Sequence, residues 1–131
     1  SGFMEKYRSA GKVSGERLVG DVAGRTVVLL DDLIASGGTL ARAAAACHDA
    51  GAVRVIGMAT HAAFTARAAG QLAHPALDAL VVTDSIFPTP VTTPAVTDKL
   101  TVLETTPLVA AAIRCLHEDG SIVDLLEPLD P

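Results

Sequence analysis

One stretch of the chain decides the fold, and it reads Val27-Val28-Leu29-Leu30-Asp31-Asp32-Leu33-Ile34-Ala35-Ser36-Gly37-Gly38-Thr39. Its first part belongs to a short, continuously apolar run, Thr26–Leu30, which is typical of a β-strand buried on both faces. Two carboxylates, Asp31 and Asp32, come directly after this strand. A tight turn with two glycines then leads into a helix, which we expect from about Leu40 to Ala50. A strand, a tight turn and a helix in this order indicate an α/β domain.

Strands and helices alternate along the rest of the chain. The further elements that we expect are strands at Val53–Ala59, Leu80–Thr83 and Leu100–Leu103, a helix at Thr65–Ala73, a loop at Phe87–Asp98, a last helix at Pro107–His117 and a short strand at Ile122–Leu126. The strands carry no polar face, which is typical of a parallel sheet covered by helices on both sides. We therefore predict an α/β fold, a Rossmann-like parallel sheet flanked by helices. Ligands of such sheets bind beyond the carboxyl ends of the strands, where Asp31–Thr39 would lie.

The last helix has the signals of a helix start and of a buried face. Thr106 is expected to be its N-cap and Pro107 its first residue. Apolar residues then recur at helical spacing, and we expect them to be buried: Leu108, Ala111, Ala112, Cys115 and Leu116. Cys47 lies at an apolar position of the earlier helix. We interpret Cys47 and Cys115 as small core residues rather than as a disulfide or a reactive thiol.

Composition excludes several classes of function. Half of the 131 residues are hydrophobic and 19% are charged, which is enough for the core of one domain. The net charge of −5 argues against a nucleic-acid partner. No apolar run approaches the roughly 18 residues that span a bilayer, so we expect no membrane partner and a cytoplasmic location. Residues 1–20 are rich in Gly, Ser and basic side chains and are expected to form a flexible loop, with a weak hairpin near Val13–Val19, ahead of a domain at 21–131.

The loop between the first strand and its helix has the composition of a phosphate site. Gly37 and Gly38 let the backbone approach an anion, and the free N–H groups of a helix start favour a phosphate there. Ser36 and Thr39 add hydroxyl groups. The carboxylates lie a few residues earlier, where they would meet vicinal hydroxyls or, through water, Mg²⁺. Phosphate at one end and a diol at the other describe ribose 5-phosphate; the alternative is a purely structural tight turn.

Two other phosphate motifs are excluded. No lysine follows the glycines, so the loop is not a P-loop, and no G-x-G-x-x-G dinucleotide motif occurs here. The stretch instead resembles the phosphoribosyl pyrophosphate (PRPP) binding motif of type I phosphoribosyltransferase folds. The whole chain is similar to the carboxy-terminal part of the ribose-phosphate diphosphokinases, or PRPP synthetases. The segments that carry this wider resemblance are Glu5–Arg8, Gly20–Arg25, Thr60-His61, Val81–Ser85 and Pro107–His117.

The resemblance implies a reaction and a set of site residues. In that family the ribose 1-hydroxyl attacks the β-phosphorus of ATP, with Mg²⁺, and AMP is released. Carried over residue by residue, the resemblance assigns Ala35, Ser36, Gly37, Gly38 and Thr39 to the 5-phosphate, Asp31 with Asp32 to the ribose hydroxyls, and Lys6 and Arg8 to catalysis. Ribose 5-phosphate and ATP would be its ligands, in a homo-oligomer. No metal site made of protein side chains alone is expected.

Three departures keep alternatives open. Tyr7 stands where the family commonly has Arg, and Ala35 stands where many members have Asp. The family's amino-terminal half, which supplies most ATP contacts, is not in this sequence, so we expect a fragment that is inactive alone. The alternatives are a type I phosphoribosyltransferase and a non-catalytic PRPP-synthetase-like subunit. His61 is expected to be a structural hydrogen-bonding residue.

Overall fold

The computed structural model describes residues 3–9, 12–86 and 93–126, and of the first two strands it describes the backbone only. The elements along the chain are β1 (Phe3–Ser9), β2 (Lys12–Val19), β3 (Thr26–Leu33), α1 (Gly38–Asp49), β4 (Arg54–His61), α2 (Ala68–Leu72), β5 (Ala79–Thr83), α3 (Pro94–Thr97), β6 (Leu100–Leu103), α4 (Thr106–His117) and a 3-10 helix at Ile122–Leu126. None of the helices in these ranges is long and apolar enough to cross a membrane.

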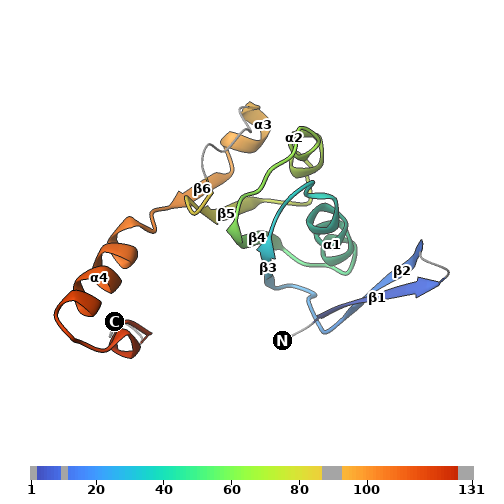
Figure 1. Cartoon of the computed structure of the whole chain (residues 1–131). Helices are drawn as coiled ribbons and strands as arrows, with labels where there is room; N and C mark the ends of the chain where they lie inside the picture. Colours follow the sequence, from blue (N-terminus) through green and yellow to red (C-terminus); the bar gives the residue numbers. More distant parts are fainter. Residues whose placement is uncertain (1–2, 10–11, 87–92, 127–131) are drawn as a thin grey trace.

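A parallel sheet of four strands forms the centre of the fold, in the order β3-β4-β5-β6 (Figure 1). Each strand is followed in sequence by its neighbour in the sheet, which leaves the carboxyl ends of all four at one edge. The turn before β3 holds its start close to the end of α1, since Gly24 N–H donates to the carbonyl of Gly51 at 2.8 Å. The predicted α/β class and the parallel sheet are therefore confirmed.

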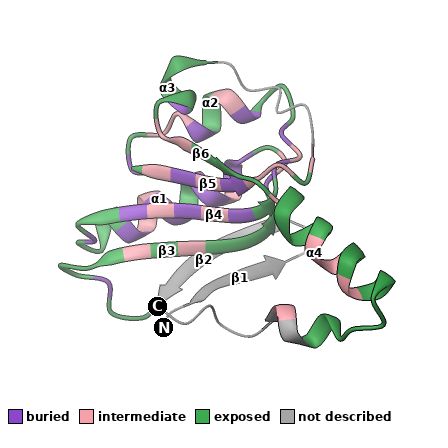
Figure 2. Ribbon diagram, turned by 90° about the vertical axis from the view of Figure 1, so that its left-hand side faces the viewer, coloured by how far each residue is buried: buried purple, intermediate pink, exposed green. Residues whose placement is uncertain are grey.

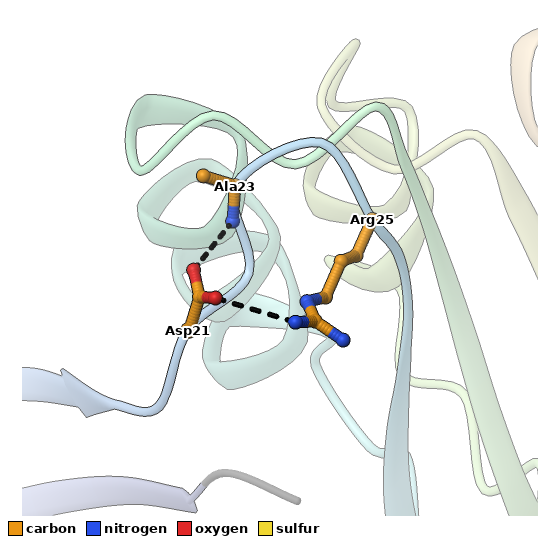
Figure 3. Close-up of polar contacts among 3 residues, drawn as sticks. All are labelled: Asp21, Ala23 and Arg25. Atoms are coloured by element: carbon orange, nitrogen blue, oxygen red, sulfur yellow. Dashed lines mark hydrogen bonds and ion pairs between the residues drawn. The ribbon is translucent and has the colours of Figure 1, made fainter.

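The turn that precedes β3 is stabilised by one aspartate. Asp21 accepts a hydrogen bond from the backbone N–H of Ala23 at 3.4 Å and pairs with the guanidinium of Arg25 at 3.3 Å (Figure 3). Gly24 has a φ of 69°, which an amino acid with a side chain rarely adopts. Because the ion pair is exposed on both sides, its free energy is small, on the order of 0–1 kcal/mol. Its role is to direct the chain into β3.

Helices α1 and α2 cover one face of the sheet. The buried side chains on this side come from both layers and include Leu40, Cys47, Val55, Leu72, Leu77, Leu80 and Val82. Gly57, in the middle of β4, sets how closely α1 approaches, because a Cβ there would lie 2.6 Å from Cδ2 of Leu40. A side chain at this position would force the side chain of Leu40 to shift.

The second face of the sheet is open. Figure 2 shows it toward the viewer, with α1 behind the strands. We define the open face by Val28, Leu30, Ile56, Met58 and Val81, which the strand register aligns across β3, β4 and β5. Leu30 is 79% exposed and Val28 48% exposed. The expectation of helices on both sides is therefore wrong for the described residues, since α1 and α2 share one side.

Helix α4 does not bury the face that its sequence predicts. It leaves β6 and points away from the sheet (Figure 1), and none of its residues is buried. Leu108 and Leu116 are exposed, while Ala111, Ala112 and Cys115 are half-buried. The predicted core role holds for Cys47, which is fully buried, and is wrong for Cys115. The pattern is amphipathic, but the contacts of α4 are chiefly with the 3-10 helix that follows it.

Other boundaries differ locally from the expected ones. The cap of α4 is Thr105, with Thr106 as the first helical residue. The segment Ile122–Leu126 is a 3-10 helix and not a strand, and it belongs to neither sheet of the described residues. Part of the expected loop at Phe87–Asp98 forms the short helix α3, and residues 87–92 lie outside the described ranges. Residues 3–19, expected to be a flexible loop with a weak hairpin, contain β1 and β2 as an antiparallel pair.

Candidate functional site

A hollow of about 160 Å³ opens where β3 ends and α1 begins. It lies at the carboxyl edge of the sheet, as expected for a ligand site of this fold. Its lining comes from the end of β3, the connecting loop and the first turn of α1, and consists of Asp31, Leu33, Ile34, Ala35, Ser36, Gly37, Thr39 and Leu40. The structure therefore brings most of the predicted ligand residues to one place.

The loop is held from the neighbouring strand and the segment after it. The buried Ile34 donates its backbone N–H to the carbonyl of His61 at 2.9 Å. The carbonyl of Ala35 accepts from the backbone N–H of Thr65 at 3.0 Å and from its hydroxyl at 3.4 Å. The sequence patterns did not identify Thr65 as a residue of the site. The only indication in the sequence was the position of Thr65 at the end of the segment after β4. These bonds fix the two residues that precede the glycine turn.

Gly37 gives the loop its sharp turn into α1. It is the N-cap of the helix with a φ of 75°. A Cβ on Gly37 would lie 2.7 Å from Cδ2 of Leu72, so both the backbone angle and the space require glycine. The hydroxyl of Ser36 accepts a long hydrogen bond from the N–H of Gly38 at 3.5 Å. Glycine is thus needed here for geometry, whether or not a ligand binds.

The start of α1 is suited to an anion. Its N-cap is Gly37, which has no side chain, its first N–H reaches Ser36 only at 3.5 Å, and its first turn holds no acidic residue. The first N–H groups of a helix point away from it and carry the positive end of its dipole. The guanidinium of Arg42 lies close by, since Nη1 is 3.3 Å from the position of a Cβ on Gly38. Arg42 is exposed, as predicted for the outer side of this helix, and its long side chain points back toward the helix start.

The two adjacent carboxylates do not share one position. β3 continues through both residues to Leu33, three residues beyond the expected end, so Asp31 and Asp32 occupy opposite faces of the strand. Asp31 lines the hollow, whereas Asp32 does not. The backbone N–H of Asp32 donates to Oδ1 of Asp31 at 3.0 Å. Asp31 is therefore the carboxylate that the fold presents beside the glycine loop.

A hydrogen-bond network lies on the same edge, between β4 and β5. Nδ1 of His61 and the hydroxyl of Ser85 are 2.8 Å apart, and the carbonyl of Thr60 accepts from Ser85 at 3.1 Å. The hydroxyl of Thr83 donates to the same carbonyl at 2.6 Å. The partners of His61 are thus the side chain and backbone of neighbouring strand ends, which fits the structural hydrogen-bonding role expected of it.

Lys6 and Arg8 lie two positions apart in β1, paired in register with Glu16 and Val13. The structure describes their backbone and not their side chains. The described residues that line the hollow come from β3, the loop and α1. Figure 1 shows the hairpin of β1 and β2 extending away from the sheet. Their catalytic role stays a prediction.

Among the residues that the structure describes, no group of three or more His, Cys, Asp or Glu side chains is placed to hold a metal ion. The most perturbed carboxyl near the site edge belongs to Asp84, which follows β5. The hydroxyl of Thr105, and then its backbone N–H, hold the pKa of Asp84 below the ordinary value of 3.8. Asp84 therefore serves the start of α4 and does not face the hollow.

The fold and the hollow together define a class: α/β domains in which the carboxyl end of a parallel strand and a glycine turn present a carboxylate beside a helix start. Residues 9–127 match the model of the phosphoribosyl synthetase-associated domain. The chain belongs to this family, that of the PRPP synthetases. The family is the one that the sequence motifs indicated.

Relatives with curated descriptions point the same way. The chain is 42% identical over 128 residues to a ribose-phosphate pyrophosphokinase of Mycobacterium tuberculosis, which covers 95% of the chain and 38% of that protein. It is 46% identical over 105 residues to the corresponding protein of Pasteurella multocida, covering 80% of the chain and 33% of that protein. The crystal structure of phosphoribosylpyrophosphate synthetase from Mycobacterium smegmatis is similar with a TM-score of 0.74 and 37% identity. The match covers 91% of this chain and 37% of that one, so the chain spans less than two-fifths of its relatives.

Proposed function

We propose that the chain provides the ribose 5-phosphate site of a PRPP-forming enzyme. The observation that carries the proposal is the hollow itself, which Asp31 and the start of α1 both line. A 5-phosphate would accept hydrogen bonds from the backbone N–H groups of Ser36–Thr39, and a carboxylate would accept them from ribose hydroxyls. The names of the relatives, ribose-phosphate pyrophosphokinases, support this choice of sugar phosphate.

The proposed reaction is transfer of a diphosphoryl group from ATP. The 1-hydroxyl oxygen of ribose 5-phosphate forms a bond to the β-phosphorus as the bond between that phosphorus and the α–β bridging oxygen breaks, so AMP leaves and the hydroxyl proton is lost. Catalysis of this kind depends on positioning and on charge stabilisation. The chain would supply the positioning of the acceptor sugar. The ATP site would come from the part of the relatives that the chain does not span.

Magnesium ion fits the donor chemistry of the site only in part. Asp31 offers the carboxylate oxygens that Mg²⁺ prefers, and Asp32 is adjacent in sequence, but Mg²⁺ binds to one or two carboxylates when phosphates complete its shell. The ion would therefore arrive with ATP and be held by Asp31 together with the substrates. When bound, it would neutralise charge on the phosphates.

Lys6 and Arg8 are proposed as the cations that close over the transferred group. Positive charge placed against phosphoryl oxygens stabilises the transition state more than the ground state. In an enzyme completed with the missing part, Lys6→Ala should lower kcat much more than it raises KM for ribose 5-phosphate. Unchanged kcat would remove Lys6 from the mechanism.

Binding of the sugar phosphate can be tested on the chain as it is. In ¹⁵N–¹H spectra, ribose 5-phosphate should shift the amides of Ser36–Leu40 and saturate, whereas ribose without phosphate should not. Replacement of Gly38 by Asp places a carboxylate at the helix start and should abolish the shifts. Asp replacing Gly70, which has open space around its Cα, is the control that should retain them. Saturable shifts elsewhere with these amides unmoved would refute the proposal.

Ala35 distinguishes the proposed PRPP-forming enzyme from the alternative, a phosphoribosyltransferase. A purine transferase has to manage the proton of the attacking base nitrogen, and Ala35, in the lining of the hollow, cannot accept or donate one. We expect no nucleotide from PRPP with hypoxanthine, guanine or adenine in the completed enzyme. Formation of any of these nucleotides would favour the transferase.

A further inference from the structure

The hydrogen-bond network around His61 is tight enough to assign its protons. The hydroxyl of Thr83 and the carbonyl of Thr60 are 2.6 Å apart, so the single proton of this hydroxyl lies between them. The hydroxyl of Ser85 is 3.1 Å from the same carbonyl and 2.9 Å from the oxygen of Thr83. Both of these oxygens act as acceptors toward Ser85. Its proton is therefore directed at one of them, because otherwise three oxygens would meet with too few hydrogens between them.

This arrangement fixes the tautomer of the His61 ring. Nδ1 of His61 lies 2.8 Å from the oxygen of Ser85, which has no proton left to donate to it. Nδ1 therefore carries a hydrogen and donates it, and in a neutral imidazole the other nitrogen is then an acceptor. Among the residues that the structure describes, the ring is hydrogen-bonded through Nδ1 alone, and His61 is exposed. The lone pair of Nε2 is thus directed outward from the network.

An irregularity in the sheet produces this geometry. The register of β4 against β5 shifts between Ala59 and His61, so that Thr60 is an extra residue on β4. The carbonyl of Thr60 is the one that accepts from the side chains at the end of β5. Bulges of this kind re-aim a side chain and are common beside functional sites. Here the side chain that follows the bulge is His61.

His61 lies against the wall of the proposed sugar-phosphate site. It is paired in register with Leu33, and its carbonyl accepts the backbone N–H of Ile34 at 2.9 Å. Leu33 and Ile34 both line the hollow, as does Asp31. Neighbouring strands are about 4.8 Å apart, a distance that a histidine side chain spans. Nδ1 is turned to Ser85 on the β5 side, and the two nitrogens of an imidazole point in nearly opposite directions, so Nε2 is turned away from β5.

The charge at this edge favours an uncharged acceptor. The proposed ligand carries a phosphate and Asp31 is a carboxylate, so a second carboxylate in contact with the sugar would add repulsion. Asp32 faces the other side of β3, and Oδ1 of Asp84 is engaged by Thr105. A neutral imidazole nitrogen accepts a hydrogen bond from a hydroxyl without adding negative charge.

We propose that His61 is a specificity-determining residue of the sugar-phosphate site. Its Nε2, held as an acceptor by the bond from Nδ1 to Ser85, receives a hydrogen bond from a ribose hydroxyl, next to the hydroxyls that Asp31 binds. The proposal deepens the proposed function and rests on it. It gives His61 the task of recognising the sugar, whereas the glycine loop recognises the phosphate.

Two-bond ¹⁵N–¹H spectra of the imidazole rings test the tautomer in the chain as it is. At pH 8, above the ordinary titration range of imidazole, Nδ1 of His61 should have the ¹⁵N shift of a protonated nitrogen and Nε2 that of an unprotonated one. Ser85→Ala should abolish this preference. A protonated Nε2 in the parent chain would overturn the proposal.

The same spectra test the contact with the ligand. Ribose 5-phosphate should move the Nε2 resonance of His61 with the same saturation as the amides of Ser36–Leu40. Inorganic phosphate that saturates these amides should leave Nε2 unmoved, because it brings no ribose hydroxyl. An equal shift with inorganic phosphate, or an unmoved Nε2 when ribose 5-phosphate saturates the amides, would overturn the proposal and leave the proposed function standing. If neither the amides nor the ring respond, both are refuted.

Calorimetry separates recognition of the sugar from a structural role. His61→Phe keeps an aromatic ring without nitrogens and should weaken ribose 5-phosphate binding by about threefold to tenfold, as expected for the loss of one neutral hydrogen bond. Its affinity for inorganic phosphate should be unchanged. His61→Gln, which retains an acceptor, should recover part of the loss, and His48→Phe, an exposed position near the far end of α1, is the control. Equal weakening of both ligands by His61→Phe would mean that His61 only supports the loop, which would overturn the proposal.

Discussion

Thr105 donates two hydrogen bonds to a single oxygen, Oδ1 of Asp84, one from its hydroxyl at 2.6 Å and one from its backbone N–H at 2.8 Å. The first connects the end of β5 to the N-cap of α4, and both stabilise the ionised carboxylate. The pKa of Asp84 is held below its ordinary value, first by the hydroxyl and then by the amide. The direction in which α4 leaves the sheet therefore depends on a charged group.

This relationship predicts a pH dependence. A carboxyl whose pKa is lowered in the folded protein contributes stability that is fully present above the ordinary value of 3.8 and is lost as pH falls through the lowered pKa. Asp84→Asn should therefore be less stable than the parent at pH 7, and the difference should shrink as pH falls below 3.8 and through the lowered pKa of Asp84. Asp98→Asn is the control, because Asp98 is also an aspartate and is exposed. Urea unfolding at several pH values measures both, and a difference that is independent of pH would contradict the prediction.

Gly37 should be intolerant of substitution for reasons that need no ligand. Gly37→Ala places a Cβ at a φ of 75° and 2.7 Å from Leu72, which is fully buried. Left-handed backbone strain and overpacking together should lower the free energy of unfolding by about 2–4 kcal/mol.

Gly70→Ala is the matched control for this change. Gly70 lies within α2 and has nothing within 4 Å of its Cβ position, so alanine should stabilise the helix by about 0.5–1 kcal/mol. Denaturant unfolding of both variants checks the pair. Equal stability of the two variants would mean that the loop adjusts at Gly37 without strain.

Asp31 and Asp32 should differ in their effect on binding. Only Asp31 lines the hollow, and adjacent strand residues face opposite sides. Asp31→Asn removes a charge-assisted hydrogen bond worth about 1.5–3 kcal/mol and should weaken ribose 5-phosphate binding at least tenfold. Asp32→Asn should change the dissociation constant less than twofold. Calorimetry measures the dissociation constant of each variant. Equal losses of affinity in the two variants would mean that both carboxylates reach the sugar.

The two cysteines should differ in reactivity. Cys47 is fully buried in the core beneath α1, and this burial raises the pKa of its thiol. Cys115 is half-buried on α4. Because the thiolate is the reacting form, a thiol reagent at pH 8 should modify Cys115 within minutes and Cys47 only when the protein unfolds. Labelling of Cys47 at the rate of Cys115 would mean that the α1 side of the core opens readily.

Sequence patterns predicted the central elements because the side chains against which these elements pack lie within the same chain. The apolar run of β3, the glycine turn and the helical spacing of Leu40 and Cys47 are all local signals, and their packing partners are present. The hollow followed from the same stretch, since strand ends and helix starts meet at one edge of a parallel sheet. Asp32 could not be separated from Asp31 without knowing that β3 continues past both.

The misses share a physical cause. The side chains of α4 have the spacing of a buried face, but spacing reports what a helix needs to bury and not whether the surface that buries it is at hand. Ile122–Leu126 has only five residues, which is too few for its apolar period to distinguish a strand from a 3-10 turn. Thr65 bonds to Ala35 through the tertiary fold, which a local pattern does not contain.

Gly57 lies in β4 beneath α1, next to Leu40, and does not line the hollow. The helix and the sheet are so close at this point that a single added carbon on Gly57 would clash with Leu40. The first turn of α1 also carries the amides of the glycine loop. A side chain at position 57 would displace the side chain of Leu40, which lines the hollow. The shape of the proposed sugar-phosphate site would then depend on a residue in the interior that does not itself line the hollow.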